Sequence, residues 1–202
     1  MPLLFDDEFE HGFGWSIECE RLTRTSHAVR AQGRVWLTDA VDGAGLDERV
    51  AALGEPAGVV QLLDRHARDC ATVAERLGVP LHVTPFAGVD GAPFLAFPIV
   101  RNRLWREVAL WFSEKRVLVC GDALGSLAYF RAPGEPFGVH PVLRLFPPKQ
   151  ALAALEPGHV LFGHGDGYHG PDAPEALAEA LSTARRRAPQ ALLETLRSTV
   201  RR

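Results

Sequence analysis

Acidic, thiol and imidazole side chains occur at three places in this sequence where an apolar stretch gives way to polar residues. These candidates are Asp69, Cys70, Asp122 and His164. Carboxylate, thiolate and imidazole groups are all ligands for Zn²⁺, which keeps one coordination position open for water when it is catalytic. A metal ion held in this way lowers the pKa of its water and polarises a carbonyl or phosphoryl oxygen. The four residues therefore predict a mononuclear hydrolytic zinc site, with Asp69 as the catalytic carboxylate.

The stretches that precede these residues have the apolar character of buried strands. Residues 59–63 form such a run, and a helical pattern follows it as far as Gly78. Residues 33–40 and 116–123 contain further strands that lead to an aspartate, and residues 158–162 lead to a histidine. Ligands of open α/β sheets bind beyond the carboxyl ends of the strands, so the candidate residues are expected to meet at one edge of a sheet.

The composition is that of one soluble globular domain that covers residues 1–202. With 47% hydrophobic and 23% charged residues, the chain has enough apolar surface to bury a large core. The net charge of -3 gives no electrostatic reason to expect a nucleic-acid partner. The sequence has no signal-peptide pattern and no run near the ~20 apolar residues of a membrane span, which predicts a cytoplasmic protein without membrane attachment. Three cysteines without a C-x-x-C pair predict reduced thiols.

Further along the chain, the sequence predicts an antiparallel strand pair and two C-terminal helices. Residues 94–100 and 106–112 fit the two strands, and the helices are expected to begin near Asp172 and Pro189. The acidic run 6–10 is expected to form a solvated face.

A proline- and glycine-rich segment, residues 131–148, is too long for a simple connector. Loops of this kind are commonly functional. His140 within it and His169 further on could reach the cleft, but they are expected to be ordinary surface histidines.

The order of these motifs resembles that of the metallo-β-lactamase-fold superfamily. Its chains have a strand ending in Asp, then H-x-H-x-D-H, then a distal His, then G-D, and finally G-H-G. The matching stretches here are 37–39, 65–70, 121–122 and 163–165. The resemblance covers nearly the whole chain. It implies an α/β fold of the four-layer αββα sandwich type, with the site at one edge of the two sheets.

Several positions depart from the pattern of this superfamily. Arg65 and Ala67 stand where the first two histidines are expected, Cys70 replaces the final one, and only Asp69 is unchanged. Arg103 stands in place of the distal histidine. All three ligands of the first metal position are thus missing, and arginines there would repel a dication, which excludes a dinuclear centre. The resemblance leaves a single second metal position formed by Asp69, Cys70, Asp122 and His164.

Three arginines and a histidine near these motif positions predict a ligand-binding cleft: Arg65, His66, Arg68 and Arg103. Guanidinium groups hold a carboxylate or phosphate by forked hydrogen bonds, which indicates a small anionic ligand. His66 is one residue out of register with the motif, so it is either a loop histidine bonded to backbone or, if a local bulge turns it inward, a metal ligand. Asp69 and Cys70 also have simpler alternative roles. Asp69 could accept backbone N–H hydrogen bonds at the N-terminus of a helix, and Cys70 could be a buried, inert thiol.

Two functions follow from the residues and the resemblance. The first is a hydrolase-like protein with at most one zinc ion, which acts on a small anionic substrate in the arginine-rich cleft. The alternative is a metal-free, non-catalytic binding or interaction protein, in which the arginines pair with Asp64, Asp69 and Asp122 inside the old metal cavity. A third hypothesis is thiol chemistry by Cys70 beside His66. These residues do not specify the substrate, and a homodimer is as compatible with them as a monomer.

Overall fold

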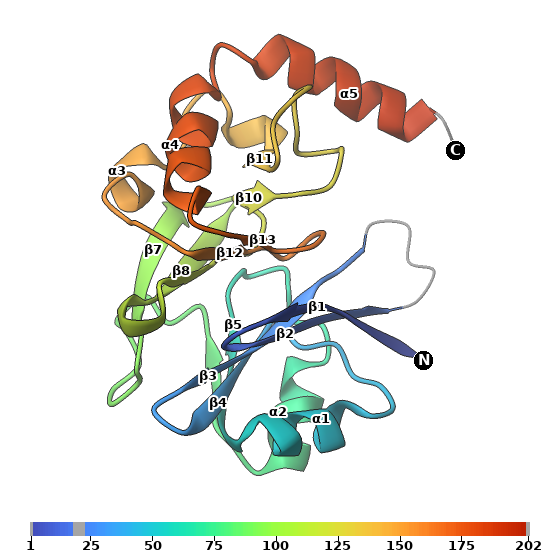
Figure 1. Cartoon of the computed structure of the whole chain (residues 1–202), viewed down its shortest axis with the longest axis vertical. Coiled ribbons are helices and arrows are strands. Elements are labelled where there is room, and N and C mark those ends of the chain that lie inside the picture. Colours follow the sequence, from blue (N-terminus) through green and yellow to red (C-terminus); the bar gives the residue numbers. More distant parts are fainter. Residues whose placement is uncertain (1, 18–22, 201–202) are drawn as a thin grey trace.

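The computed structural model describes residues 2–17 and 23–200, and two β-sheets run through its centre (Figure 1). The first sheet has the strand order β1-β2-β3-β4-β5-β6. Its strands are β1 (Leu3–Phe9), β2 (Gly12–Ile17), β3 (Ser26–Ala31), β4 (Arg34–Thr38), β5 (Glu55–Gln61) and β6 (Leu81–Val83). Neighbouring strands are antiparallel as far as β4, whereas β4, β5 and β6 are parallel. The parallel pairs are possible because the helices α1 (Leu46–Leu53) and α2 (Cys70–Leu77) form the crossovers.

The second sheet has the strand order β13-β12-β9-β8-β7. Its strands are β7 (Leu95–Arg101), β8 (Arg106–Phe112), β9 (Val117–Val119), β12 (His159–Leu161) and β13 (Tyr168–His169). Strands β9 and β12 are parallel. The chain between them contains the small hairpin β10 (Leu124–Gly125) and β11 (Gly138–Val139), a 3-10 turn (Pro141–Leu143) and α3 (Lys149–Leu152). Two helices, α4 (Ala173–Thr183) and α5 (Ala188–Val200), follow the sheet.

Alternating side chains of the first sheet pack into two different cores. Val35 and Leu37 of β4 pack with residues of α1 and α2 in one core. Trp36 lies between them in the sequence and packs with residues of β8 and β9 from the second sheet. This alternation follows from the two-residue period of a strand, which sends successive side chains to opposite faces. The first sheet is therefore covered by helices on one face and by the second sheet on the other.

The second sheet is built in the same way. Leu118 and Val160 pack against α4, which contributes Leu177 and Leu181 to a third core. The neighbouring residue Leu161 faces the first sheet. The layers are thus helix, sheet, sheet and helix, which confirms the predicted αββα sandwich (Figure 1).

Most predicted elements are present, with one correction. The strand pair is confirmed as β7 and β8, and the two C-terminal helices begin at Ala173 and Ala188. The acidic run 6–10, however, is not solvated throughout: β1 buries Asp7, which is 5% exposed. No helix in the described part of the chain is long and apolar enough to cross a membrane.

Candidate metal centre

Three loops meet at one edge of the two sheets and bring His66, Asp122 and His164 together. His66 lies between β5 and α2, Asp122 follows β9, and His164 follows β12. Strands β9 and β12 are parallel, so their carboxyl ends lie at the same edge. Isolated bridges from Leu63 to Glu107 and from Arg24 to His164 join the first sheet to the second here.

Both imidazoles face the same carboxylate oxygen. The Nε2 atom of His66 lies 3.1 Å from Oδ1 of Asp122, and the Nε2 atom of His164 lies 3.3 Å from it. One potential ligand atom of each residue lies within 4.8 Å of the corresponding atoms of the other two. The three side chains are 9%, 15% and 15% exposed, so the cluster is largely shielded from solvent.

In each imidazole, the Nδ1 atom, which is not the nitrogen facing Asp122, lies beside a group that can only accept a hydrogen bond. Nδ1 of His66 donates to Oδ2 of Asp39 at 2.8 Å, and Nδ1 of His164 donates to the carbonyl of Thr23 at 3.1 Å. With the proton on Nδ1, a neutral imidazole presents its Nε2 lone pair to Asp122. Metal-binding histidines characteristically have such an outer acceptor, because it fixes the tautomer and the ring orientation.

The residues present fit a single divalent ion. Oδ1 of Asp122 is buried, and no described residue gives it a hydrogen bond of good geometry, although both Nε2 atoms lie within 3.3 Å. A metal ion would satisfy this oxygen and both lone pairs at once. Two imidazoles and one carboxylate also form a donor set that catalytic zinc uses, with the fourth position open. The carboxylates of Asp39 and Asp122 place negative charge beside the two imidazoles, which favours a cation, whereas the charge of Arg68 opposes it.

The site without a metal ion has its own charge balance. Burial lowers the pKa of the His66 imidazole, but the carboxylates of Asp39 and Asp122 outweigh this effect and raise the pKa to about 9. Burial raises the pKa of Asp122, but the neighbouring His164 and His66 outweigh this effect and hold it well below its usual range. At neutral pH His66 is therefore an imidazolium between two carboxylates, and a metal ion would displace its Nε2 proton.

A cavity of about 140 Å³ opens beside the cluster and is lined by Asp122, Tyr129, Phe130, His140 and His164. Nδ1 of His140 accepts the backbone N–H of Val142, and its Nε2 lies 3.5 Å from the Tyr129 hydroxyl. Burial lowers the pKa of His140 to about 4, so the ring is neutral and carries its proton on Nε2. The expectation that His140 is an ordinary surface histidine is therefore wrong. It offers an N–H donor at the cavity.

Asp69 and Cys70, both predicted ligands, are not brought to this cluster. The Asp69 carboxylate accepts the backbone N–H of Asp42 at 2.9 Å, and the residue precedes the first turn of α2. Cys70 packs in the core between α2 and the first sheet, and burial raises the pKa of its thiol to about 12. A thiol with such a pKa is not a thiolate at neutral pH. The structure thus corrects the predicted ligand set of Asp69, Cys70, Asp122 and His164. Only Asp122 and His164 of this set lie in the cluster, and His66 joins them.

The three predicted ligand-binding arginines have three different environments. Arg65 is exposed and stacks over the Trp105 ring at 4.8 Å, and Trp105 in turn contacts the His140 ring. Arg68 donates to the carbonyls of Thr25, Asp39 and Gly163 at 2.7 to 2.9 Å. Arg103 is exposed in the turn between β7 and β8.

The predicted replacement of the metal by arginine–carboxylate pairs does not match this arrangement. The Arg68 guanidinium donates to the carbonyl oxygens of Thr25, Asp39 and Gly163, and Arg65 approaches Asp64 only at 3.9 Å near the surface. Among the described residues, it is the His66 imidazole that lies between the buried carboxylates of Asp39 and Asp122.

A shift of one residue explains why the motif alignment missed His66. If His66 is placed on the second histidine of H-x-H-x-D-H, Arg68 falls on the aspartate. Arg68 has a positive φ of 41°, a conformation that redirects the chain just before α2. Asp39, which the strand-ending motif had already indicated, is the residue that fixes His66. No sequence signal indicated Tyr129 or Phe130.

The Glu107 carboxylate holds the loop that carries Asp122 by hydrogen bonds to its backbone. Its Oε1 accepts the backbone N–H groups of Gly121 and Ala123 at 2.9 and 3.0 Å, and its Oε2 accepts the indole N–H of Trp105 at 2.7 Å. The residue is fully buried. Burial first, and then the charge of Asp122, raise the pKa of Glu107 to about 7.

We expect the metal-free protein to lose stability as the pH rises from about 4.3, the pKa of an exposed glutamic acid, to about 7. The folded state binds more protons than the unfolded state in this window, so the contribution of Glu107 falls by a total on the order of 3 kcal/mol. The indole N–H resonance of Trp105 should titrate with a midpoint near 7. Glu107→Gln should abolish that titration, and the exposed control Glu55→Gln should retain it. An indole signal that is constant across the window would contradict the prediction.

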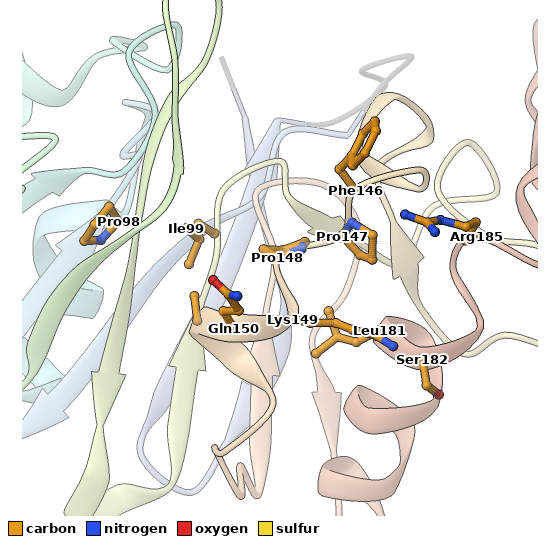
Figure 2. A pocket seen from close by; sticks show the side chains of 11 residues that line it. Pro98, Ile99, Phe146, Pro147, Pro148, Lys149, Gln150, Leu181, Ser182 and Arg185 are labelled. Atoms are coloured by element: carbon orange, nitrogen blue, oxygen red, sulfur yellow. The ribbon is translucent and has the colours of Figure 1, made fainter.

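A larger hollow lies away from this cluster. A groove of about 840 Å³ lies beside β7, α3 and α4 and is lined mainly by apolar residues, with Phe146 and Arg185 at one end (Figure 2). Its lining in the described chain contains no imidazole, thiol or carboxylate. It therefore lacks the side chains that usually bind a metal ion.

Comparison with known proteins identifies the fold. No family model and no curated protein sequence matches the chain. The solved structure of DIM-1 metallo-β-lactamase is similar, with 14% identity and a TM-score of 0.63 over 94% of this chain and 98% of that one. TMB-1 has 10% identity and a TM-score of 0.62 over 95% and 100% of the two chains. A metallo-β-lactamase from Pontibacter korlensis has 10% identity and a TM-score of 0.60 over 90% and 99%.

These similarities establish the fold of the chain. They do not establish its function, because sequence identities of 10 to 14% are too low for that. The chain is a protein of the metallo-β-lactamase fold, as the order of its motifs predicted. More particularly, it is a divergent one, since the sequence identity is low over nearly the full length of each chain.

Proposed function

We propose that this chain is a hydrolase-like protein that binds one zinc ion through His66, Asp122 and His164. One observation carries the proposal: both Nε2 atoms converge on the buried Oδ1 of Asp122, while both Nδ1 atoms donate to fixed acceptors. Two imidazoles whose Nδ1 atoms are fixed in this way are preorganised to bind a metal ion through their Nε2 atoms.

When bound, zinc would supply a water of lowered pKa and polarise a carbonyl or phosphoryl oxygen. The protein would supply the rest of the chemistry. Asp39 holds the His66 ring in place, and Phe130 stacks on His164 with ring centres 6.0 Å apart, which shields that side from water. The Nε2–H group of His140 and the Tyr129 hydroxyl line the cavity and would donate hydrogen bonds to an oxygen that gains negative charge.

The cavity favours a small substrate with an anionic group. Its volume of about 140 Å³ is below the ~300 Å³ at which pockets for drug-sized ligands begin. The charge of Arg65 acts on His140 across the Trp105 ring. A carboxylate or phosphate held at this rim would place the bond to be hydrolysed in the cavity. Arg68 and Arg103 are not part of this proposed contact, because Arg68 is committed to carbonyl groups and Arg103 lies in the β7–β8 turn.

Metal analysis together with hydrolysis assays tests the proposal. Untagged protein should be stripped with a chelator, reloaded with zinc, and assayed on small carboxylate-bearing esters, thioesters and phosphoesters. We expect hydrolysis that disappears with the chelator and returns with zinc. Hydrolysis that is unaffected by zinc removal, or zinc that binds equally well after His164→Gln, would overturn it.

One observation favours a second candidate, a metal-free binding protein. His66 lies 2.8 Å from Asp39 and 3.1 Å from Asp122, so an imidazolium can occupy the position of the cation. In that case the cavity would bind a small anion without hydrolysing it. The reloading experiment separates the two functions, because this candidate requires that no zinc binds at His66, Asp122 and His164.

A further inference from the structure

We propose that Glu10, His11 and His159 form a second zinc site, separate from the centre at His66, Asp122 and His164. One potential ligand atom of each residue lies within 4.8 Å of those of the other two. Glu10 and His11 form the turn between β1 and β2, and His159 is the first residue of β12. His164 lies beyond the other end of β12, so the two sites are at opposite ends of one strand.

The three side chains form an open, partly exposed set of donors. Nε2 of His11 lies 3.9 Å from Oε2 of Glu10, and the rings of His11 and His159 meet at 79° with their centres 5.7 Å apart. The His11 side chain is 14% exposed, whereas that of Glu10 is 77% exposed and free to adjust. Two partly buried imidazoles and one adaptable carboxylate leave a fourth position for water.

A chain of hydrogen bonds sets the tautomer of His159. Oδ1 of Asp7 lies 2.9 Å from Nε2 of His169, and a carboxylate only accepts, so this nitrogen carries the proton. Nδ1 of a neutral His169 is then bare. It lies 2.9 Å from Nδ1 of His159, which must therefore donate to it. The free nitrogen of His159 is Nε2, and it presents a lone pair for a metal ion.

This supporting chain is rigid. Asp7 is 5% exposed and also accepts the backbone N–H of Gly167 at 2.9 Å. Phe9 stacks on the His169 ring at 14° with centres 5.2 Å apart, and it packs against His159 at 5.1 Å. A carboxylate that acts through one imidazole on another makes the second a better ligand and fixes its orientation. The buried aspartate in an otherwise acidic surface run thus has a physical role.

The donor set selects the class of metal. Imidazole nitrogens with one carboxylate suit Zn²⁺ and its transition-metal neighbours, whereas Mg²⁺ and Ca²⁺ prefer all-oxygen sites. The nearby cations Arg30, Lys115 and Arg116 oppose a dication, but solvent at this partly exposed position screens them. An ion here would join the β1–β2 turn of the first sheet to β12 of the second. Its role would be to hold the two sheets together, independently of any hydrolysis.

Zinc binding to untagged Asp122→Asn protein tests this site in isolation, because that substitution removes the carboxylate of the first centre. We expect one zinc per chain by competition with a chromophoric chelator, and a rise in melting temperature on zinc addition, since a ligand that binds only the folded state stabilises it. Adding His159→Gln should remove both effects. Adding His82→Gln, a histidine outside both clusters, should change neither.

Two further measurements keep the test decisive if His159→Gln fails to fold. Glu10→Gln changes an exposed side chain and should weaken zinc binding at least about tenfold. Imidazole ¹⁵N shifts should show His159 protonated on Nδ1 before zinc and a perturbed Nε2 signal after it. The proposal is overturned if the Asp122→Asn protein binds no zinc, if binding survives both Glu10→Gln and His159→Gln, or if the His159 signal does not respond.

Discussion

Replacing Asp122 with asparagine should lower zinc affinity at the His66–Asp122–His164 centre more than about 100-fold, beyond the ~10- to 100-fold typical of outer supporting residues. Oδ1 of Asp122 is the atom on which both Nε2 atoms converge, at 3.1 and 3.3 Å. An amide of the same shape removes the negative charge that offsets the dication. Zinc-dependent hydrolysis should fall with the loss of the metal, because no other acid in the cavity lining can replace this ligand among the described residues.

The measurement is zinc titration of stripped protein, with hydrolysis followed on the same samples. Asp90→Asn makes the same chemical change at an exposed turn and serves as the control. Circular dichroism should show that both variants are folded. Wild-type affinity at this centre in the Asp122→Asn protein, or full hydrolysis without zinc, would show that Asp122 is not a ligand.

Replacing Arg144 with methionine should destabilise the protein by about 3 to 5 kcal/mol, the usual result of removing one partner of a buried ion pair. Arg144 is 1% exposed and pairs with both carboxylate oxygens of Glu135, at 3.2 and 2.5 Å. It also donates to the carbonyl of Phe130 at 2.6 Å. Without the guanidinium, the partners left to the buried charge of Glu135 among the described residues are the backbone N–H of Ala132 and the more distant Arg187.

The same substitution should disturb the cavity, because Arg144 braces the segment that carries Phe130 and His140. Urea unfolding gives the change in stability, and the KM for the substrate reports the cavity. The double variant Arg144→Met/Glu135→Met should recover much of the lost stability, since an apolar pair avoids the uncompensated charge. The exposed control Arg34→Met should change stability little. A loss below about 1 kcal/mol in the Arg144→Met protein would contradict the prediction.

The sequence predicted the fold better than the site. Apolar strands, helix ends and the order of the motifs were sufficient for the αββα sandwich, and they placed Asp122 and His164 at one sheet edge. They failed between residues 64 and 70. There the positive φ of Arg68 decides which side chains turn inward, and residue types do not reveal that conformation.

The segment 131–148 shows a similar division. Its composition indicated a functional loop, and His140 within it does line the cavity. The residue types alone left open whether His140 reaches the cleft, because its position depends on the buried pair of Arg144 and Glu135 and on contacts with Trp105. Such contacts join residues whose spacing has no periodic pattern.

By itself, then, the amino-acid sequence determined which stretches alternate between two cores and which strand ends carry acids and imidazoles. That information is local, since a strand's two-residue period and a helix's end residues act over a few positions. Only the tertiary structure decided which nitrogen of each histidine is free, because this depends on acceptors far away in the chain: Thr23 for His164, Asp39 for His66, and Asp7 for His169. Metal binding depends on distances of a few ångströms between such groups, and folding alone brings them together.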